Sequence, residues 1–127
     1  MIETALVYGS DHKILHWHLP AGRTGGSIPD SPDLWNVLWD NRRLVMGVAH
    51  SHPGTGVPSP SWTDLTTFAA IESGLGKRLY WPILSEDSYT LVEWEESFSC
   101  YSQVQISDEP PWAYELRLKS GYRILEP

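Results

Sequence analysis

Two histidines separated by a single residue are the feature of this chain best suited to metal chemistry. His50 and His52 follow the apolar segment 44–49 and come directly before a Pro-Gly turn. In a β-strand, residues i and i+2 point to the same face, so the two imidazoles would project side by side. Asp64, in the first turn of a predicted helix, would supply a third ligand. Three protein ligands leave the fourth tetrahedral position for water, which is typical of a catalytic zinc site.

The same residues also have an interpretation that needs no metal. A His-x-His pair on a strand often has only a structural role. Ser61 with Asp64 three residues later is an ordinary capping pattern at the start of a helix. That pattern accounts for Ser61 and Asp64. It does not explain why a histidine pair comes directly before a turn and a short loop that leads to the capped helix. The combination therefore favours a site for Zn²⁺.

The residues His-Ser-His-Pro at 50–53, followed by Ser61-x-x-Asp64, resemble the signature of the JAMM metalloproteases, the catalytic members of the JAB/MPN domain superfamily. The resemblance implies that His50, His52 and Asp64 bind zinc. It implies that Ser61 helps to stabilise the tetrahedral intermediate. It also implies that a glutamate on an upstream strand activates the zinc-bound water.

Glu3 is the best match to this upstream glutamate, because it precedes a short apolar strand that ends at Gly9. A residue so near the start of a chain is otherwise expected to be frayed and solvated. The spacing from Glu3 to Gly9 is one residue shorter than is typical of the family, and the spacing from His52 to Asp64 is one residue longer. A loop rich in proline and glycine can absorb the second difference. With these departures, the resemblance extends from about residue 3 to about residue 94.

The reaction implied by the resemblance is hydrolysis of a peptide or isopeptide bond. Family members release ubiquitin, ubiquitin-like proteins or sulfur-carrier proteins from their conjugates. Because the chain lacks the longer insertions with which eukaryotic deubiquitinases hold ubiquitin, we expect a small prokaryotic or phage-type enzyme that acts on the C-terminal tail of a ubiquitin-like or sulfur-carrier protein. The tail could add as a strand beside the sheet. Trp62, next to Ser61, could line the substrate groove.

Three other classes stay open at this stage. The first is a non-catalytic MPN-type scaffold that binds partner proteins. The second is a RadC-like protein associated with DNA. The third is a zinc hydrolase or deaminase for small molecules. The formal net charge of −7 and the pI of about 5.0 argue against nucleic acid as a partner, because phosphate binding requires a basic surface.

Length and composition fit one domain over residues 1–127, with residues 96–127 as a C-terminal extension packed on it. Cys100 is the only cysteine, so no disulfide can form within the chain. No apolar run reaches the 18 residues of a membrane span, and no leader is evident, so we expect a cytoplasmic protein without membrane contact. A second copy or a partner could cover the face on which relatives carry an N-terminal helix.

Hydrophobic patterns predict a mixed sheet with helices on its faces. This order agrees with what the resemblance implies, the single-domain α/β sandwich of the JAB/MPN fold, which is itself similar to the fold of cytidine deaminase. A second histidine pair, His16 and His18, is expected to face solvent. The sequence predicts strands at 3–8, 13–19, 44–50, 78–84 and 88–94, and a loop at 20–32. One helix is predicted to start at residue 31 with a core face of Leu34, Trp35, Leu38 and Trp39, and a second to run from about 62 to 73 with a cap at Gly74. Residues 112–118 and 122–125 are predicted to form a hairpin.

Overall fold

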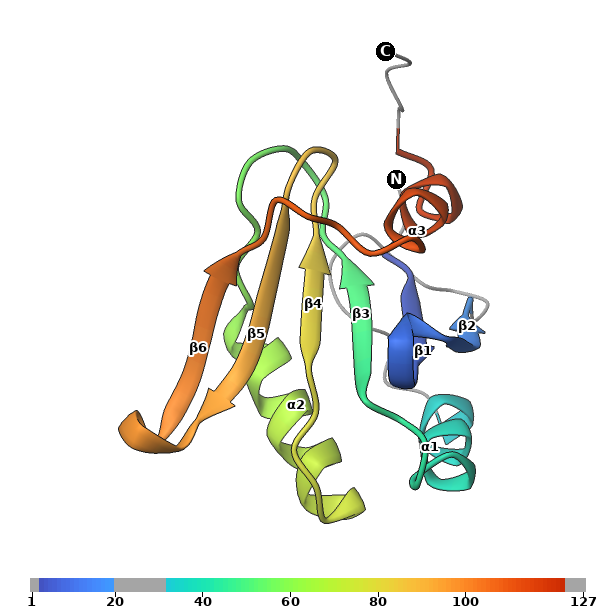
Figure 1. Cartoon of the computed structure of the whole chain (residues 1–127), viewed down its shortest axis with the longest axis vertical. Helices are drawn as coiled ribbons and strands as arrows, with labels where there is room; N and C mark the ends of the chain where they lie inside the picture. The colour runs from blue at the N-terminus through green and yellow to red at the C-terminus, as the bar shows by residue number, and fades with distance from the viewer. Residues whose placement is uncertain (1–2, 20–31, 123–127) are drawn as a thin grey trace.

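Six strands form one mixed sheet in the order β2-β1-β3-β4-β5-β6 (Figure 1). The computed structural model describes residues 3–19 and 32–122. Within them, β3 and β4 are parallel and the other neighbouring strands are antiparallel. The strands are β1 (Ala5–Tyr8), β2 (Ile14–His18), β3 (Gly47–Ser51), β4 (Trp81–Leu84), β5 (Tyr89–Glu95) and β6 (Cys100–Gln105); the helices are α1 (Pro32–Asp40), α2 (Trp62–Leu75) and α3 (Ala113–Lys119), with 3-10 turns at Ser10–His12 and Glu96–Phe98.

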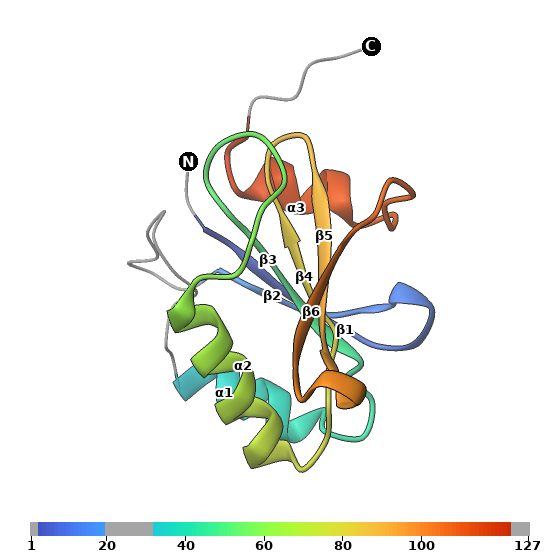
Figure 2. The same ribbon diagram turned by 90° about the vertical axis from the view of Figure 1, so that its left-hand side faces the viewer.

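Helices cover both faces of the sheet, which confirms the predicted α/β architecture (Figure 2). Side chains alternate between the two faces along each strand. On one face, Val7 and Val48 pack with α1 and α2, where Phe68 is fully buried. On the other face, Leu6 and Ala49 pack against α3. The α/β sandwich therefore has two apolar cores, one on each side of β1 and β3.

Helix α2 begins as predicted and ends two residues later than predicted. Ser61 caps it, and Gly76 at its C-terminal end adopts a φ of +71°, a left-handed conformation that suits glycine. Gly74, the predicted cap, lies inside the helix instead. A Cβ atom at Gly74 would approach the Trp35 ring to 2.6 Å, so this glycine allows α1 and α2 to pack closely.

The C-terminal hairpin predicted for residues 112–118 and 122–125 is wrong, because residues 113–119 form α3. Trp112, Ala113 and Leu116 are buried with a helical spacing, whereas the apolar residues at 112, 114, 116 and 118 also alternate as they would in a strand. Residues 123–125 lie outside the described part of the chain, as does nearly all of the loop predicted at 20–32. β6 is a mostly polar edge strand that was not predicted from the sequence.

The structure also differs from the prediction in the starts of two strands, in the buried face of α1 and in the burial of His18. Residues 44–46 were predicted as strand, but Leu44 is the exposed end of a turn and β3 begins only at Gly47. β4 starts at Trp81 rather than residue 78. Trp35 and Trp39 lie at the surface, so only Leu34 and Leu38 of the predicted core face of α1 are buried. His18 is buried and not solvent-facing. No helix among the described residues has the length and apolar character needed to cross a membrane.

A buried carboxylate joins α2 to the strands beside it. Glu72 accepts hydrogen bonds from the backbone N–H of Leu79 at 2.8 Å and from Trp81 Nε1 at 3.1 Å, and it also binds Arg78 and the hydroxyl of Tyr101. The donors of Leu79 and Trp81 are buried, so removing the carboxylate leaves buried polar groups without this partner. The contacts therefore fix the end of α2 relative to β4 and β6.

We expect Glu72→Leu to lower the free energy of unfolding by about 3 kcal/mol, because each buried donor left unpaired costs roughly 1–3 kcal/mol. Urea denaturation of the two proteins measures the change. Glu115→Ala is the matched control, since Glu115 is exposed and forms only an i,i+4 pair with Lys119. Such a surface pair contributes about 0.3–0.5 kcal/mol. Equal losses in both variants would contradict the role assigned to Glu72.

Candidate metal centre

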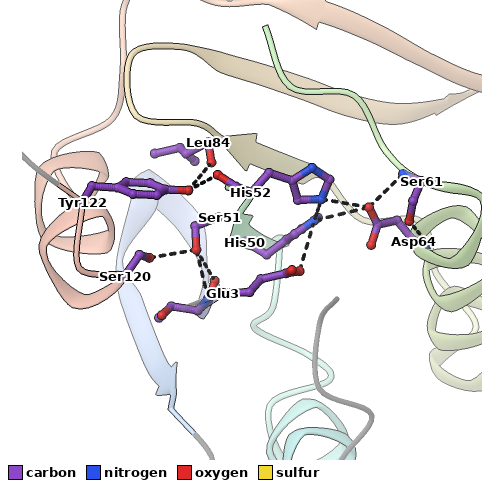
Figure 3. Close-up of polar contacts among 10 residues, drawn as sticks. Glu3, His50, Ser51, His52, Ser61, Asp64, Leu84, Ser120 and Tyr122 are labelled. Atoms are coloured by element: carbon purple, nitrogen blue, oxygen red, sulfur yellow. Dashed lines mark hydrogen bonds and ion pairs between the residues drawn. The ribbon is translucent and has the colours of Figure 1, made fainter. Parts of the chain in front are cut away.

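Four side chains predicted from the sequence converge on one point between β3 and the N-terminal end of α2 (Figure 3). One ligand atom each from Glu3, His50, His52 and Asp64 can be chosen so that all four lie within 4.8 Å of one another. The Nε2 atoms of His50 and His52 are 2.9 Å apart. Asp64 Oδ2 lies 3.0 Å from Nε2 of His52 and 3.6 Å from Nε2 of His50. The structure therefore brings together the residues that the sequence reading proposed.

The pairing of β1 with β3 places Glu3 beside the histidines. Ala5 lies opposite His50 in an antiparallel register, and the backbone N–H of Ser51 donates to the carbonyl of Thr4 at 3.0 Å. Glu3 is two residues before Ala5, so both point to the same face. His50 and His52 share that face for the same reason. The pairing of the two strands thus brings the side chains of Glu3, His50 and His52 together on one face of the sheet.

The capping box of α2 orients the fourth side chain. The hydroxyl of Ser61 accepts from the backbone N–H of Asp64 at 3.0 Å, and Asp64 Oδ2 accepts from the backbone N–H of Ser61 at 2.9 Å. The cap interpretation and the metal interpretation are therefore compatible, because the cap aims the same carboxylate oxygen at both histidines. Ser61 itself is exposed at the edge of the site.

Burial and charge set the protonation of the possible ligands. Burial opposes ionisation of Asp64, but the contacts with His50 and His52 and the bond from Ser61 together hold the pKa of this carboxyl well below its usual range. Burial lowers the pKa of His50, although Asp64 opposes the shift. An ionised carboxylate and a neutral imidazole are the forms that bind metal ions.

Glu3 differs from the other three residues because its carboxylate has no hydrogen-bond partner among the described residues. It is only 1% exposed, and its Oε1 lies 3.9 Å from Nε2 of His50. Burial, followed by the charge of Asp64, raises the pKa of Glu3 to about 8. Glu3 is thus neither frayed nor solvated, and a buried carboxyl group without a hydrogen-bond partner points to a function.

The donor set fits a zinc ion. Zinc prefers histidine nitrogen and carboxylate oxygen, and bonds of about 2.0 Å in a tetrahedral site place neighbouring ligand atoms about 3.3 Å apart. The three separations between His50, His52 and Asp64 are 2.9, 3.0 and 3.6 Å. Glu3 is further from the group. Its carboxylate is in a position to contact a molecule that binds beside the three ligands.

The loop between His52 and α2 is fixed by contacts that the sequence reading missed. The backbone N–H of Gly56 donates to Asp87 at 2.8 Å, and the hydroxyl of Ser85 donates to the carbonyl of Gly56 at 2.6 Å. The backbone N–H of Glu86 donates to the carbonyl of Gly54 at 3.0 Å. The turn between β4 and β5 therefore anchors the proline- and glycine-rich loop that separates His52 from Asp64.

His16 and His18, the second histidine pair, take no part in the site. Their ring centroids lie 6.2 Å apart on β2. Over residues 3–19 and 32–122, the one group of three or more possible metal ligands is the set of Glu3 and its three neighbours. Cys100 is exposed and free.

The described residues thus combine a mixed sheet with one buried histidine, one half-buried histidine and two buried carboxylates that could hold a metal ion. The sequence matches the family of prokaryotic homologs of the JAB domain over residues 7–100, about three quarters of the chain. The chain therefore belongs to the prokaryotic JAB family, which confirms the resemblance seen in the sequence. The match begins after Glu3, so the assignment of that residue depends on the structure rather than on the match. A search among curated proteins found no match.

Proposed function

We propose that the chain is a zinc-dependent hydrolase that cleaves a peptide or isopeptide bond at the C-terminal tail of a ubiquitin-like or sulfur-carrier protein. The single observation that carries the proposal is the buried carboxylate of Glu3, which accepts no hydrogen bond from the described residues and lies beside the three possible ligands. A structural metal site would need no such group. A hydrolytic site needs an acid-base residue within reach of the attacking water.

The roles of the side chains follow from their positions. His50, His52 and Asp64 would hold the ion. When bound there, zinc would polarise the scissile carbonyl and lower the pKa of a coordinated water from 15.7 to about 7. Glu3 accepts a proton from the attacking water and donates it to the leaving amine as the C–N bond breaks. The products are a carboxylic acid and an amine, so each proton is accounted for.

The choice of a protein tail as substrate is supported by the surface beside the site. Trp62 follows Ser61 directly and is 83% exposed, although it is a large aromatic residue. Exposed tryptophans are common anchors for protein partners. Ser61 is also exposed, so both residues can contact an extended chain that enters the site from solvent. A non-catalytic scaffold would have no use for the buried carboxylate of Glu3.

Incubation of the zinc-loaded protein with linear fusions of ubiquitin-like and sulfur-carrier proteins tests the proposed function. We expect cleavage after the C-terminal glycine of the carrier, which a chelator abolishes and added zinc restores. Mass spectrometry of the products identifies the bond that is cut. Cleavage of small amides but not of the fusions would indicate a hydrolase for small molecules instead. Absence of any hydrolysis by protein shown to contain zinc would favour the scaffold.

We expect Ser61→Ala to reduce turnover by about 10²- to 10³-fold, the usual effect of removing one oxyanion donor. The hydroxyl oxygen of Ser61 accepts the cap bond, but its hydrogen is not used by any group among the described residues, so it is free to donate to the oxyanion. The same change should lower stability by about 0.5–2 kcal/mol through loss of the cap. Steady-state kinetics and urea denaturation measure the two effects.

Ser61→Thr is the matched variant, because threonine keeps both the hydroxyl and the cap. It should retain most of the activity and most of the stability. A loss of stability without a loss of turnover in Ser61→Ala would limit Ser61 to the capping role.

A further inference from the structure

We propose that the C-terminal end of α3 is a positioning element for the metal strand, and that Ser120 and Tyr122 act on zinc affinity without contacting the ion. The inference rests on the proposed function, because it concerns the same site. Both residues lie beyond residue 100, where the match to the family ends. Both are buried, and both contact the segment that carries His50 and His52 (Figure 3).

The first contact is made through Ser51, the residue between the two histidines. Because side chains alternate along a strand, Ser51 points away from the metal ligands and toward α3. Its hydroxyl oxygen accepts from the backbone N–H of Thr4 at 2.9 Å and lies 2.8 Å from the hydroxyl oxygen of Ser120. Thr4 is the neighbour of Glu3. A single buried hydroxyl thus connects the glutamate strand, the histidine strand and α3.

The hydroxyl of Ser120 extends this series of hydrogen-bond contacts into the helix. It lies 2.7 Å from the carbonyl oxygen of Leu116, which is one turn earlier in α3. The hydroxyl of Thr4 also lies 3.5 Å from the carbonyl of Lys119. The hydroxyl of Ser120 can donate either to Ser51 or to the carbonyl of Leu116, and the hydroxyl of Ser51 lies 3.5 Å from the carbonyl oxygen of Thr4. The position of β1 relative to β3 is therefore tied to the last turn of the helix.

The second contact is made by Tyr122 with the backbone of a possible ligand. Its hydroxyl donates to the carbonyl oxygen of His52 and lies 3.3 Å from the carbonyl oxygen of Leu84. The backbone N–H of His52 donates to the same carbonyl of Leu84 at 2.7 Å. His52 is the first residue after β3, where pairing with β4 ends. The backbone of His52 is therefore held on both sides, at its N–H by Leu84 of β4 and at its carbonyl by Tyr122.

These contacts act from the face opposite the site. Neither Ser120 nor Tyr122 belongs to the group of possible metal ligands. Their effect must pass through Ser51 and through the backbone of His52. A shift of that backbone would move the imidazole of His52 away from Asp64, whereas the apolar core under α3 would be largely preserved. Residues that orient metal ligands in this indirect way typically contribute 10- to 100-fold to metal affinity.

The test compares Tyr122→Phe and Ser120→Ala with Tyr114→Phe in the full chain. Tyr114 lies on the same helix but is 58% exposed, so it serves as the control. Zinc affinity is measured by competition with a chromophoric chelator, the ligand geometry by the visible spectrum of the Co²⁺-substituted protein, and stability by urea denaturation. We expect zinc affinity to fall by about 10- to 100-fold in the first two variants and the Co²⁺ spectrum to change. The control should match the wild type.

Unchanged zinc affinity and an unchanged Co²⁺ spectrum in both variants would overturn the inference, even if their stability falls. If Tyr122→Phe does not fold, Ser51→Ala tests the same connection from the strand side, with Ser51→Thr as the variant that should restore affinity. The result also separates this inference from the proposed function. Wild-type protein that binds no zinc would refute both, whereas active wild type with unaffected variants would refute only the positioning role.

Discussion

Replacing Glu3 with glutamine is expected to reduce amide hydrolysis by about 10²- to 10⁴-fold while zinc stays bound, because the change removes the group that transfers the proton. The amide group of glutamine has nearly the same shape as the carboxyl group of glutamate, so the packing around residue 3 should be preserved. The carboxylate lies outside the close group formed by His50, His52 and Asp64. Turnover of a carrier fusion and zinc content by elemental analysis measure the two outcomes in one preparation.

The matched control for Glu3→Gln is Glu96→Gln, which makes the same chemical change at an exposed residue. The control should keep full activity and full zinc content. Full activity of Glu3→Gln would exclude Glu3 from the reaction. Loss of zinc from Glu3→Gln would instead make Glu3 a fourth ligand, a result that favours a closed structural site.

Replacing His52 with alanine is expected to abolish both zinc binding and hydrolysis. His52 supplies one of the three closest ligand atoms, and alanine leaves only His50 and Asp64 at short range. Zinc binding also stabilises the fold by mass action, by about 2.7 kcal/mol when free zinc is 100 times its dissociation constant. Thermal denaturation with and without zinc should therefore show a clear upward shift in wild type and none in His52→Ala.

His16→Ala is the control for this experiment, because His16 belongs to the other histidine pair and lies outside the group of possible ligands. It should keep the zinc-dependent shift and the activity. A zinc-dependent shift of equal size in His52→Ala would contradict the assignment of His52. Loss of the shift in His16→Ala would indicate that β2 contributes to metal binding.

The arrangement of the site was predictable because it depends on short-range geometry. A strand places His50 and His52 on one face, and a capping box fixes Asp64 in the first turn of α2. These rules require only the spacing of residues within one element. Glu3 is different, because its position depends on pairing between β1 and β3, and only the family resemblance suggested it before the structure placed Ala5 opposite His50.

The parts of the fold that were mispredicted are those where local pattern gives a weak signal. Residues 112–118 carry apolar side chains whose spacing fits either a strand or a helix, and packing of Leu116 against the sheet decides in favour of the helix. β6 is polar and lies at the sheet edge, so no apolar run marks it. The contact of Tyr122 with His52 joins residues 70 positions apart, and no sequence rule predicts it.

The most direct test of the central claim is a crystal structure of the protein grown with zinc. The account predicts one ion bound by the Nε2 atoms of His50 and His52 and by the carboxylate of Asp64, with a water molecule as the fourth ligand within hydrogen-bond distance of Glu3. An ion held by four protein side chains, or full zinc saturation with no ion at these residues, would contradict it.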